Sequence, residues 1–142
     1  MSQSFPNHLF EYEIKVMPHH LDQQQHVNNV MYVQLMQEIA GKHWDSVPLL
    51  VIEEGIVWVV RRHEIDYLNE AFLNDSLLLR TWTGENTSVT WNRYCEIVRL
   101  SDQKKIISSK SIWVLLDKQT GKPKKINQEM LMRFSPTQVI PS

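Results

Sequence analysis

The sequence predicts an α+β fold in which an antiparallel sheet of about five to six strands wraps around one central helix. Three observations favour this class. The first segment alternates apolar and charged residues, a later segment has helical periodicity, and the remaining segments are dense in β-branched and aromatic residues. Short polar separators between those last segments favour antiparallel neighbours. A single domain over residues 1–142 accommodates all of these elements.

The first strand and the helix are the clearest elements. Residues 9–17 place apolar side chains on one face and charged side chains on the other, and Pro18 ends the strand. Residues 30–44 repeat apolar side chains at helical spacing, with Asn28 or Asn29 as the N-cap and Pro48 enforcing a stop. Inside that helix Gly41 costs about 1 kcal/mol relative to alanine, so we expect it to admit a closely packed strand.

Four further strands are predicted over residues 56–67, 77–82, 89–100 and 106–116. Turn-like residues at 74–76, 85–87, 101–103 and 117–123 separate or follow them, and residues 127–134 suit a short helix. One long helix cannot cover both faces of such a sheet. We therefore expect the outer face to pack against a second copy of the chain.

Composition excludes several classes of function. The net charge of −1 provides no general attraction to nucleic acid, and four glycines without a phosphate-loop motif argue against nucleotide cofactors. No apolar run approaches the ~20 residues that a membrane helix needs, and the first residues lack a secretory signal. Cys95 is the only cysteine, which excludes an intrachain disulfide and fits a reducing, cytoplasmic compartment. We expect no nucleic-acid partner, no membrane partner and no cofactor.

Residues 20–32, His-Leu-Asp-Gln-Gln-Gln-His-Val-Asn-Asn-Val-Met-Tyr, are unusually polar for the entrance to an apolar helix. The start of a helix carries unpaired backbone N–H groups and partial positive charge, which can bind a developing oxyanion. Asp22 is the only acid between Glu13 and Glu38. Its carboxylate could attack a carbonyl polarised by the helix start, or activate a water to do so.

Other interpretations of these residues stay open on composition alone. Polar residues before a helix are usually capping and loop residues, and composition alone favours that interpretation here. His19, His20, Asp22 and His26 show no recognised ligand spacing, so no metal site is predicted. Cys95 lacks a Cys-His motif and is predicted to be a buried structural thiol. Arg61 and Arg62 should face opposite sides of a strand, where one meets a substrate phosphate or both are surface charges.

The polar stretch resembles the active-site pattern of hotdog-fold acyl thioesterases of the 4-hydroxybenzoyl-CoA thioesterase type. Asp22, Val27, Asn29 and Tyr32 match that pattern, whereas Gln25 replaces a glycine or alanine. The stretch is also similar to plant acyl-ACP thioesterases, with Gln24 in place of an asparagine; the residues that match them are Leu21, Asp22, His26, Val27, Asn28, Asn29, Val30 and Tyr32. Residues 64–68, 73–75, 112–117, 120–123 and 126 extend the resemblance over roughly residues 10–130.

The resemblance implies a hotdog fold and an acyl-CoA thioester hydrolase that releases a free acid and CoA, with acyl-ACP as an alternative substrate. Asp22 would be the nucleophile or general base, the Asn29 backbone N–H would polarise the carbonyl, and His26 would assist. Substrate-binding residues would be Gln24, Gln25, Val27, Asn28, Tyr32 and Arg61. The resemblance further implies a homodimer or homotetramer with sites between protomers, and a role in fatty acid metabolism.

Two rival functions fit the same resemblance. A hotdog domain can bind acyl thioesters without hydrolysing them, or act as a hydratase or dehydratase on enoyl or 3-hydroxyacyl thioesters. The Gln25 departure bears on this choice, because glycine permits close backbone approach and special backbone angles that glutamine resists.

Overall fold

The computed structural model describes residues 9–47 and 54–134 of the chain. Within these ranges the chain forms one long helix, two short helices and five strands. In order they are β1 (Phe10–Lys15), η1 (Pro18–His20), α1 (Asn29–Ser46), β2 (Ile56–Tyr67), β3 (Ser76–Asn86), β4 (Thr90–Arg99), β5 (Lys104–Asp117) and α2 (Gln128–Phe134).

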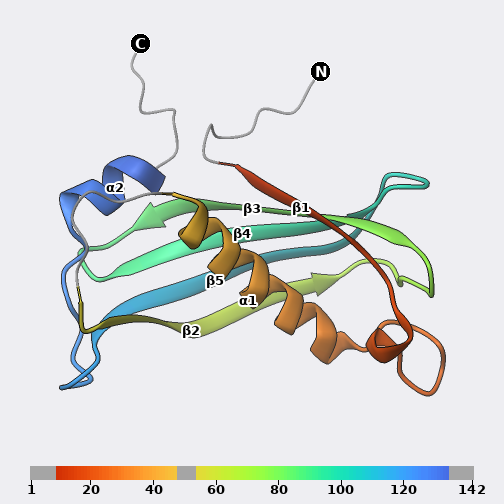
Figure 1. Ribbon diagram of the computed structural model, residues 1–142, viewed down its shortest axis with the longest axis horizontal. Coiled ribbons are helices and arrows are strands. Elements are labelled where there is room, and N and C mark those ends of the chain that lie inside the picture. Colours follow the sequence, from red (N-terminus) through yellow and green to blue (C-terminus); the bar gives the residue numbers. More distant parts are fainter. Residues whose placement is uncertain (1–8, 48–53, 135–142) are drawn as a thin grey trace, which may run out of the picture.

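The five strands form one antiparallel sheet in the order β1-β3-β4-β5-β2, and α1 crosses one face of it (Figure 1). The predicted α+β arrangement of a sheet around a single long helix is therefore confirmed. The expectation that consecutive strands lie side by side is wrong for β2 and β3. The strand β1 occupies the edge beside β3, so β2 pairs with β5 at the opposite edge of the sheet.

Element boundaries follow from local chemistry. The Asn28 side chain accepts a hydrogen bond from Val30 N at 3.0 Å, which identifies Asn28 as the N-cap of α1. Pro48, the predicted helix stop, lies outside the described residues. So do residues 1–8, in which no secretory signal is predicted. The β3 strand runs to Asn86 rather than residue 82, because Thr83 still pairs with Arg93 and, after a register shift, Asn86 pairs with Trp91.

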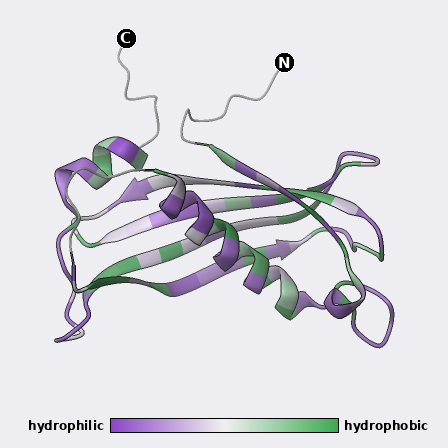
Figure 2. Cartoon of the chain, in the orientation of Figure 1, coloured by the Kyte–Doolittle hydropathy of each residue, from purple (hydrophilic) through white to green (hydrophobic). Residues whose placement is uncertain are grey.

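The main core lies between α1 and the sheet. The buried helix residues Tyr32, Leu35, Met36 and Ile39 pack with buried strand residues that include Leu77, Leu79, Ile97 and Ile107. Figure 2 shows how apolar and polar residues alternate along α1 and the strands. A second cluster joins α2 to the sheet; its buried members are Trp91, Leu115, Ile126, Met130 and Phe134.

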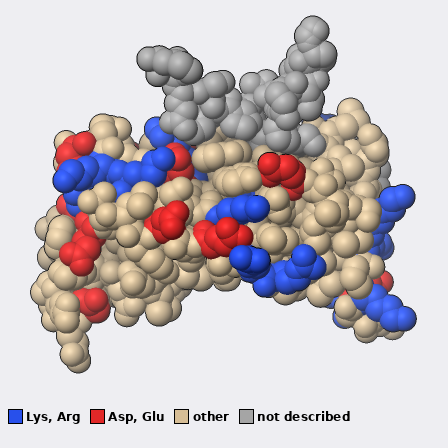
Figure 3. Space-filling model, turned by 180° about the vertical axis from the view of Figure 1, so that it is seen from behind, with Lys and Arg blue, Asp and Glu red and all other residues tan. Residues whose placement is uncertain are grey.

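The face of the sheet away from α1 carries charge. Arg80 on β3 makes ion pairs with Glu11 on β1 at 2.8 Å and with Glu96 on β4 at 3.9 Å. Figure 3 shows charged groups distributed over this side of the molecule. No helix in the described part of the chain is both long enough and apolar enough to cross a membrane.

Candidate functional site

The polar stretch folds into a tight loop that Asp22 organises. Its carboxylate Oδ1 accepts hydrogen bonds from Gln24 N at 2.8 Å and His26 N at 3.2 Å. Its backbone N–H donates to His26 O at 2.8 Å, which closes the loop. At the tip, Gln25 has a positive φ of 67°, in the left-handed region that favours glycine. A glutamine thus adopts a backbone conformation in this turn that a glycine would adopt without strain.

Two backbone hydrogen bonds fix the loop against the rest of the domain. Val27 N donates to Ala71 O at 3.0 Å, and Asn28 N donates to His20 O at 2.9 Å. The Asn28 side chain is already bonded to Val30 N. The N–H of Asn29, the first residue of α1, donates to no described residue. An unused donor at a helix start is a ready partner for an anion or a polarised carbonyl oxygen.

The loop forms one wall of an open pocket of about 450 Å³. The opposite wall is the end of β2 and the residues after it, from Tyr67 to Glu70. His26 Nδ1 lies 3.0 Å from Glu70 Oε1, so a histidine–carboxylate pair bridges the two walls. The His26 ring also meets the Phe72 ring edge to face, with centroids 5.5 Å apart.

Tyr32 closes the inner end of this pocket. The side chain is buried, and its hydroxyl makes no hydrogen bond with a described residue. Burial raises the pKa of Tyr32 to about 12, and the nearby Ala71 backbone offsets this only in part. The hydroxyl is thus a protonated donor that lacks an acceptor until a ligand supplies one.

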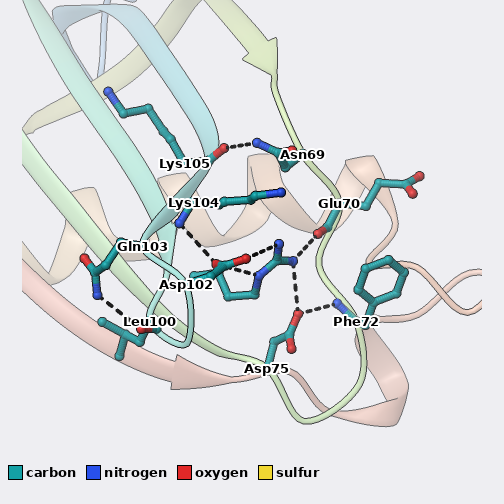
Figure 4. A network of polar contacts seen from close by, with 10 residues as sticks. Asn69, Glu70, Phe72, Asp75, Leu100, Asp102, Gln103, Lys104 and Lys105 are labelled. Carbon is teal, nitrogen blue, oxygen red and sulfur yellow. Dashed lines mark hydrogen bonds and ion pairs between the residues drawn. The ribbon is translucent and has the colours of Figure 1, made fainter.

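A polar network holds the Glu70 wall in place (Figure 4). Arg99 Nη1 donates to Glu70 O at 2.7 Å and lies 3.5 Å from Asp75 Oδ2, while Arg99 Nε donates to Asp102 Oδ1 at 3.0 Å. The Glu70 carboxylate points away from this network in Figure 4. It instead forms the ion pair with His26. Asn69 is fixed through Nδ2 to Lys105 O at 2.8 Å.

The structure brings together most of the residues that the sequence predicted for the site. The pocket is lined by Asp22, Gln24, His26, Val27, Asn28, Asn29 and Tyr32. Gln25 and Arg61 do not line it: Gln25 is exposed at the loop tip, and Arg61 is exposed at a bulge in β2. Sequence reasoning missed the Tyr67–Glu70 wall. The Asn69-Glu70 pair directly after a long predicted strand was the available signal.

Other candidate groups have structural roles. Cys95 is buried as predicted, and burial raises its pKa to about 12, which leaves the thiol protonated. His20 Nδ1 accepts a hydrogen bond from Met17 N at 2.8 Å, so this nitrogen is occupied. Within residues 9–47 and 54–134, no three His, Cys, Asp or Glu side chains gather in a way that could hold a metal ion.

Residues 7–134 match the acyl-ACP thioesterase N-terminal domain family. The chain belongs to this family. Its fold is the hotdog fold, as the sequence predicted. No curated protein sequence matches the chain significantly.

Solved structures share the fold at low sequence identity. The 12:0-ACP thioesterase from Umbellularia californica superposes with a TM-score of 0.78 and 17% identity, covering 89% of this chain and 49% of its own. The chain thus spans about half the length of that enzyme. The 1,4-dihydroxy-2-naphthoyl-CoA thioesterase from Synechocystis superposes with a TM-score of 0.77 and 17% identity. The match covers 89% of this chain and 95% of that protein's chain. A hypothetical Staphylococcus aureus protein in complex with CoA superposes with a TM-score of 0.81 and 13% identity. The match covers 99% of this chain and 94% of that protein's chain.

Proposed function

We propose that this family member hydrolyses acyl thioesters at the Asp22 pocket. The observation that carries the proposal is that Asp22 and Asn29, whose N–H donates to no described residue, line one pocket. The first supplies a nucleophile or base, and the second supplies an electrophilic donor at the positive end of α1. Membership of a thioesterase family supports the same chemistry.

Each group has a defined role in the proposed reaction. The thioester carbonyl oxygen accepts the Asn29 N–H, which stabilises the negative charge that develops on that oxygen. Asp22 either attacks the carbonyl carbon itself or takes a proton from a water that attacks it. If water attacks, the C–S bond of the resulting adduct breaks to give the acid, and the thiolate takes up the proton held by Asp22 and leaves as a thiol. If Asp22 attacks, the C–S bond breaks to leave an acyl–Asp22 anhydride and a thiolate that takes a proton from solvent. A water then hydrolyses the anhydride, which releases the acid and regenerates Asp22. The two hydrogen bonds to Asp22 from Gln24 N and His26 N keep its carboxylate in place.

The pair formed by His26 and Glu70 has a positioning role in this proposal. Glu70 fixes the imidazole across the pocket opening, with Nδ1 held at 3.0 Å. The second ring nitrogen is then oriented toward water or the leaving group, as a histidine anchored by a carboxylate generally is. The Tyr32 hydroxyl supplies a further donor to an oxygen of the bound substrate.

The thiol carrier is proposed to be CoA or acyl carrier protein, with a cytoplasmic setting. Similarity supports both carriers, because the Umbellularia protein is a 12:0-ACP thioesterase and the Staphylococcus protein is described in complex with CoA. We further propose that two copies of the chain assemble. The β2 strand is an edge of the sheet and is 12 residues long, and long unpaired edges invite pairing with another strand.

The test is thiol release from short, medium, long and aromatic acyl-CoAs, measured with a thiol-trapping dye. We expect Asp22→Asn to lower turnover by two or more orders of magnitude, because a general base or nucleophile is lost. The amide oxygen of the introduced asparagine can still accept both loop hydrogen bonds, so folding should persist. Asp117→Asn is the matched control, because Asp117 Oδ1 likewise accepts two backbone N–H groups, Gln119 N and Thr120 N at 2.9 Å each.

The outcomes of this assay distinguish a hydrolase from a non-catalytic binding domain and from a hydratase. Loss in Asp22→Asn and not in Asp117→Asn supports the hydrolase. Equal rates in wild type and Asp22→Asn would remove Asp22 from the chemistry. Binding of acyl-CoA without thiol release from any CoA or ACP substrate would identify a non-catalytic binding domain. Absorbance change at an enoyl thioester without thiol release would identify a hydratase.

A further inference from the structure

A second pocket lies toward the other end of α1. It has a volume of about 240 Å³, and its lining includes Trp44, Trp58, Trp91, Trp113, Phe134 and Arg93. Its glycine, Gly41, lies twelve residues beyond Asn29, or about 18 Å along the helix. The lining shares no residue with the Asp22 pocket.

Four of the aromatic side chains contact one another in a closed ring. Trp44 stacks on Phe134 at 4.8 Å and meets Trp58 at 5.7 Å, while Trp91 lies 6.3 Å from Trp58 and 6.1 Å from Phe134. The carbonyl of Phe134 accepts a hydrogen bond from Thr83, which fixes the end of α2 beside the pocket. Such walls suit a flat aromatic ligand, because indole and phenyl rings stack with other rings.

Arg93 gives this aromatic pocket a cation. Its Nη1 donates to His43 Nδ1 at 2.9 Å and to Thr81 Oγ1 at 3.0 Å, and both of these partners lack negative charge in this arrangement. No described residue accepts a hydrogen bond from its Nε or Nη2, and no described carboxylate forms an ion pair with it. Asp45 lines the same pocket but is exposed and does not pair with Arg93.

A guanidinium in this position needs a counter-ion. Burial lowers the pKa of Arg93 to about 10, which still leaves it protonated at neutral pH. Buried cations are normally paired with an acidic group, and an arginine matches a carboxylate with two parallel hydrogen bonds. A second donor, Trp58 Nε1, is buried without an acceptor among the described residues. The pocket thus offers donors and aromatic surface but no buried carboxylate.

We propose that this pocket binds a free aromatic carboxylate of one or two rings, with the carboxylate on Arg93 and the ring among the tryptophans. The volume suits this class, since an apolar cavity of about 150 Å³ is enough to hold benzene. The inference does not rest on the proposed hydrolysis, because the two pockets are separate and the readout is binding.

Gly41 provides the sharpest variant. We expected this glycine to admit a closely packed strand, and that expectation is wrong. A Cβ built at Gly41 meets no heavy atom within 4 Å, so the glycine leaves open space beside the pocket. Gly41→Leu should fill that space without straining the helix, and Gly41→Ala is the matched control with the same gain in helix propensity.

The experiment is titration of the full chain with 2-naphthoate, 2-naphthamide and octanoate, followed by tryptophan fluorescence and calorimetry. We expect 2-naphthoate to bind about tenfold or more tighter than the neutral amide, because hydrogen bonds to a charged group are the stronger ones. We also expect it to bind more tightly than octanoate. Gly41→Leu should weaken 2-naphthoate binding about tenfold or more, whereas Gly41→Ala and Asp22→Asn should bind it as wild type does.

Four results would overturn the proposal. Equal affinity for acid and amide would show that Arg93 does not recognise a carboxylate. Tighter binding of octanoate would identify an aliphatic site instead. Unchanged 2-naphthoate binding in Gly41→Leu, or loss of that binding in Asp22→Asn, would place the ligand outside this pocket. Arg93→Lys adds a check, because a lysine keeps the charge but not the paired hydrogen bonds and should weaken 2-naphthoate binding if folding is retained.

Discussion

Replacing Gln25 by glycine should stabilise the protein. Gln25 has φ of 67°, and a left-handed backbone costs an L-residue about 1–2 kcal/mol. Glycine removes that cost but adds about 0.4–1 kcal/mol of conformational entropy to the unfolded chain. The side chain of Gln25 is exposed and hydrogen-bonds to no described residue, so no contact opposes the gain. The expected net effect is about 0.5–1 kcal/mol, or about 1–4 °C in Tm.

The assay is urea unfolding followed by tryptophan fluorescence, at one fixed protein concentration so that any assembly contributes equally. Gln25→Ala is the first control, because alanine keeps Cβ and should leave stability nearly unchanged. Gln103→Gly is the second control, at φ of 60° in the β4–β5 turn. It should gain less, because it also loses the hydrogen bond from Gln103 Nε2 to Leu100 O at 3.1 Å. A Gln25→Gly variant no more stable than Gln25→Ala would refute the backbone argument.

Three further predictions follow from the structure. Glu70→Gln should lower thioester turnover by roughly tenfold, because His26 loses its charged partner but stays in place. This loss should be smaller than the loss caused by Asp22→Asn. Steady-state rates on the best substrate measure it. Burial lowers the pKa of His63 below 6.5. As the pH falls through 6.5, this histidine is therefore protonated in the unfolded chain before it is in the folded chain, and stability decreases. Urea unfolding at pH 7.5 and 5.5 should therefore show a smaller loss for His63→Asn than for wild type. Light scattering should give a mass of a dimer or larger, and a stable monomer would contradict assembly through the β2 edge.

The elements with strong periodicity could be predicted from sequence. The β2 strand occurs at the predicted residues, and α1 extends the prediction by one residue at its start and two at its end. The helix buries a regular apolar face, and β2 is dense in β-branched and aromatic residues. The position of β1 beside β3 could not be predicted. Nothing local to residues 10–15 specifies a partner, and the pairing of Ile14 with Leu77 depends on where the helix carries the chain.

The candidate site also has one part that could be predicted from sequence and one part that could not. The Asp22–Tyr32 wall is continuous in sequence, so its loop and cap residues could be found from their pattern. The Glu70 wall depends on Arg99, which lies on a different strand and holds the Glu70 carbonyl at 2.7 Å. A contact between residues so far apart in sequence leaves no local pattern. The left-handed backbone of Gln25 could not be predicted from its identity, and it occurs in a loop that the hydrogen bonds of Asp22 close.

The two pockets follow from one geometric property of the fold. A curved sheet packs most closely against the middle of a straight helix, where Leu35, Met36 and Ile39 are buried. Toward each end the helix and sheet leave space, and each space takes its chemistry from the nearest residues. At the N-terminus of the helix Asn29 lines the same pocket as Asp22, and toward the other end Arg93 lines a pocket with several aromatic side chains. Because the closely packed middle separates them, a substitution in one pocket should leave ligand binding in the other unchanged.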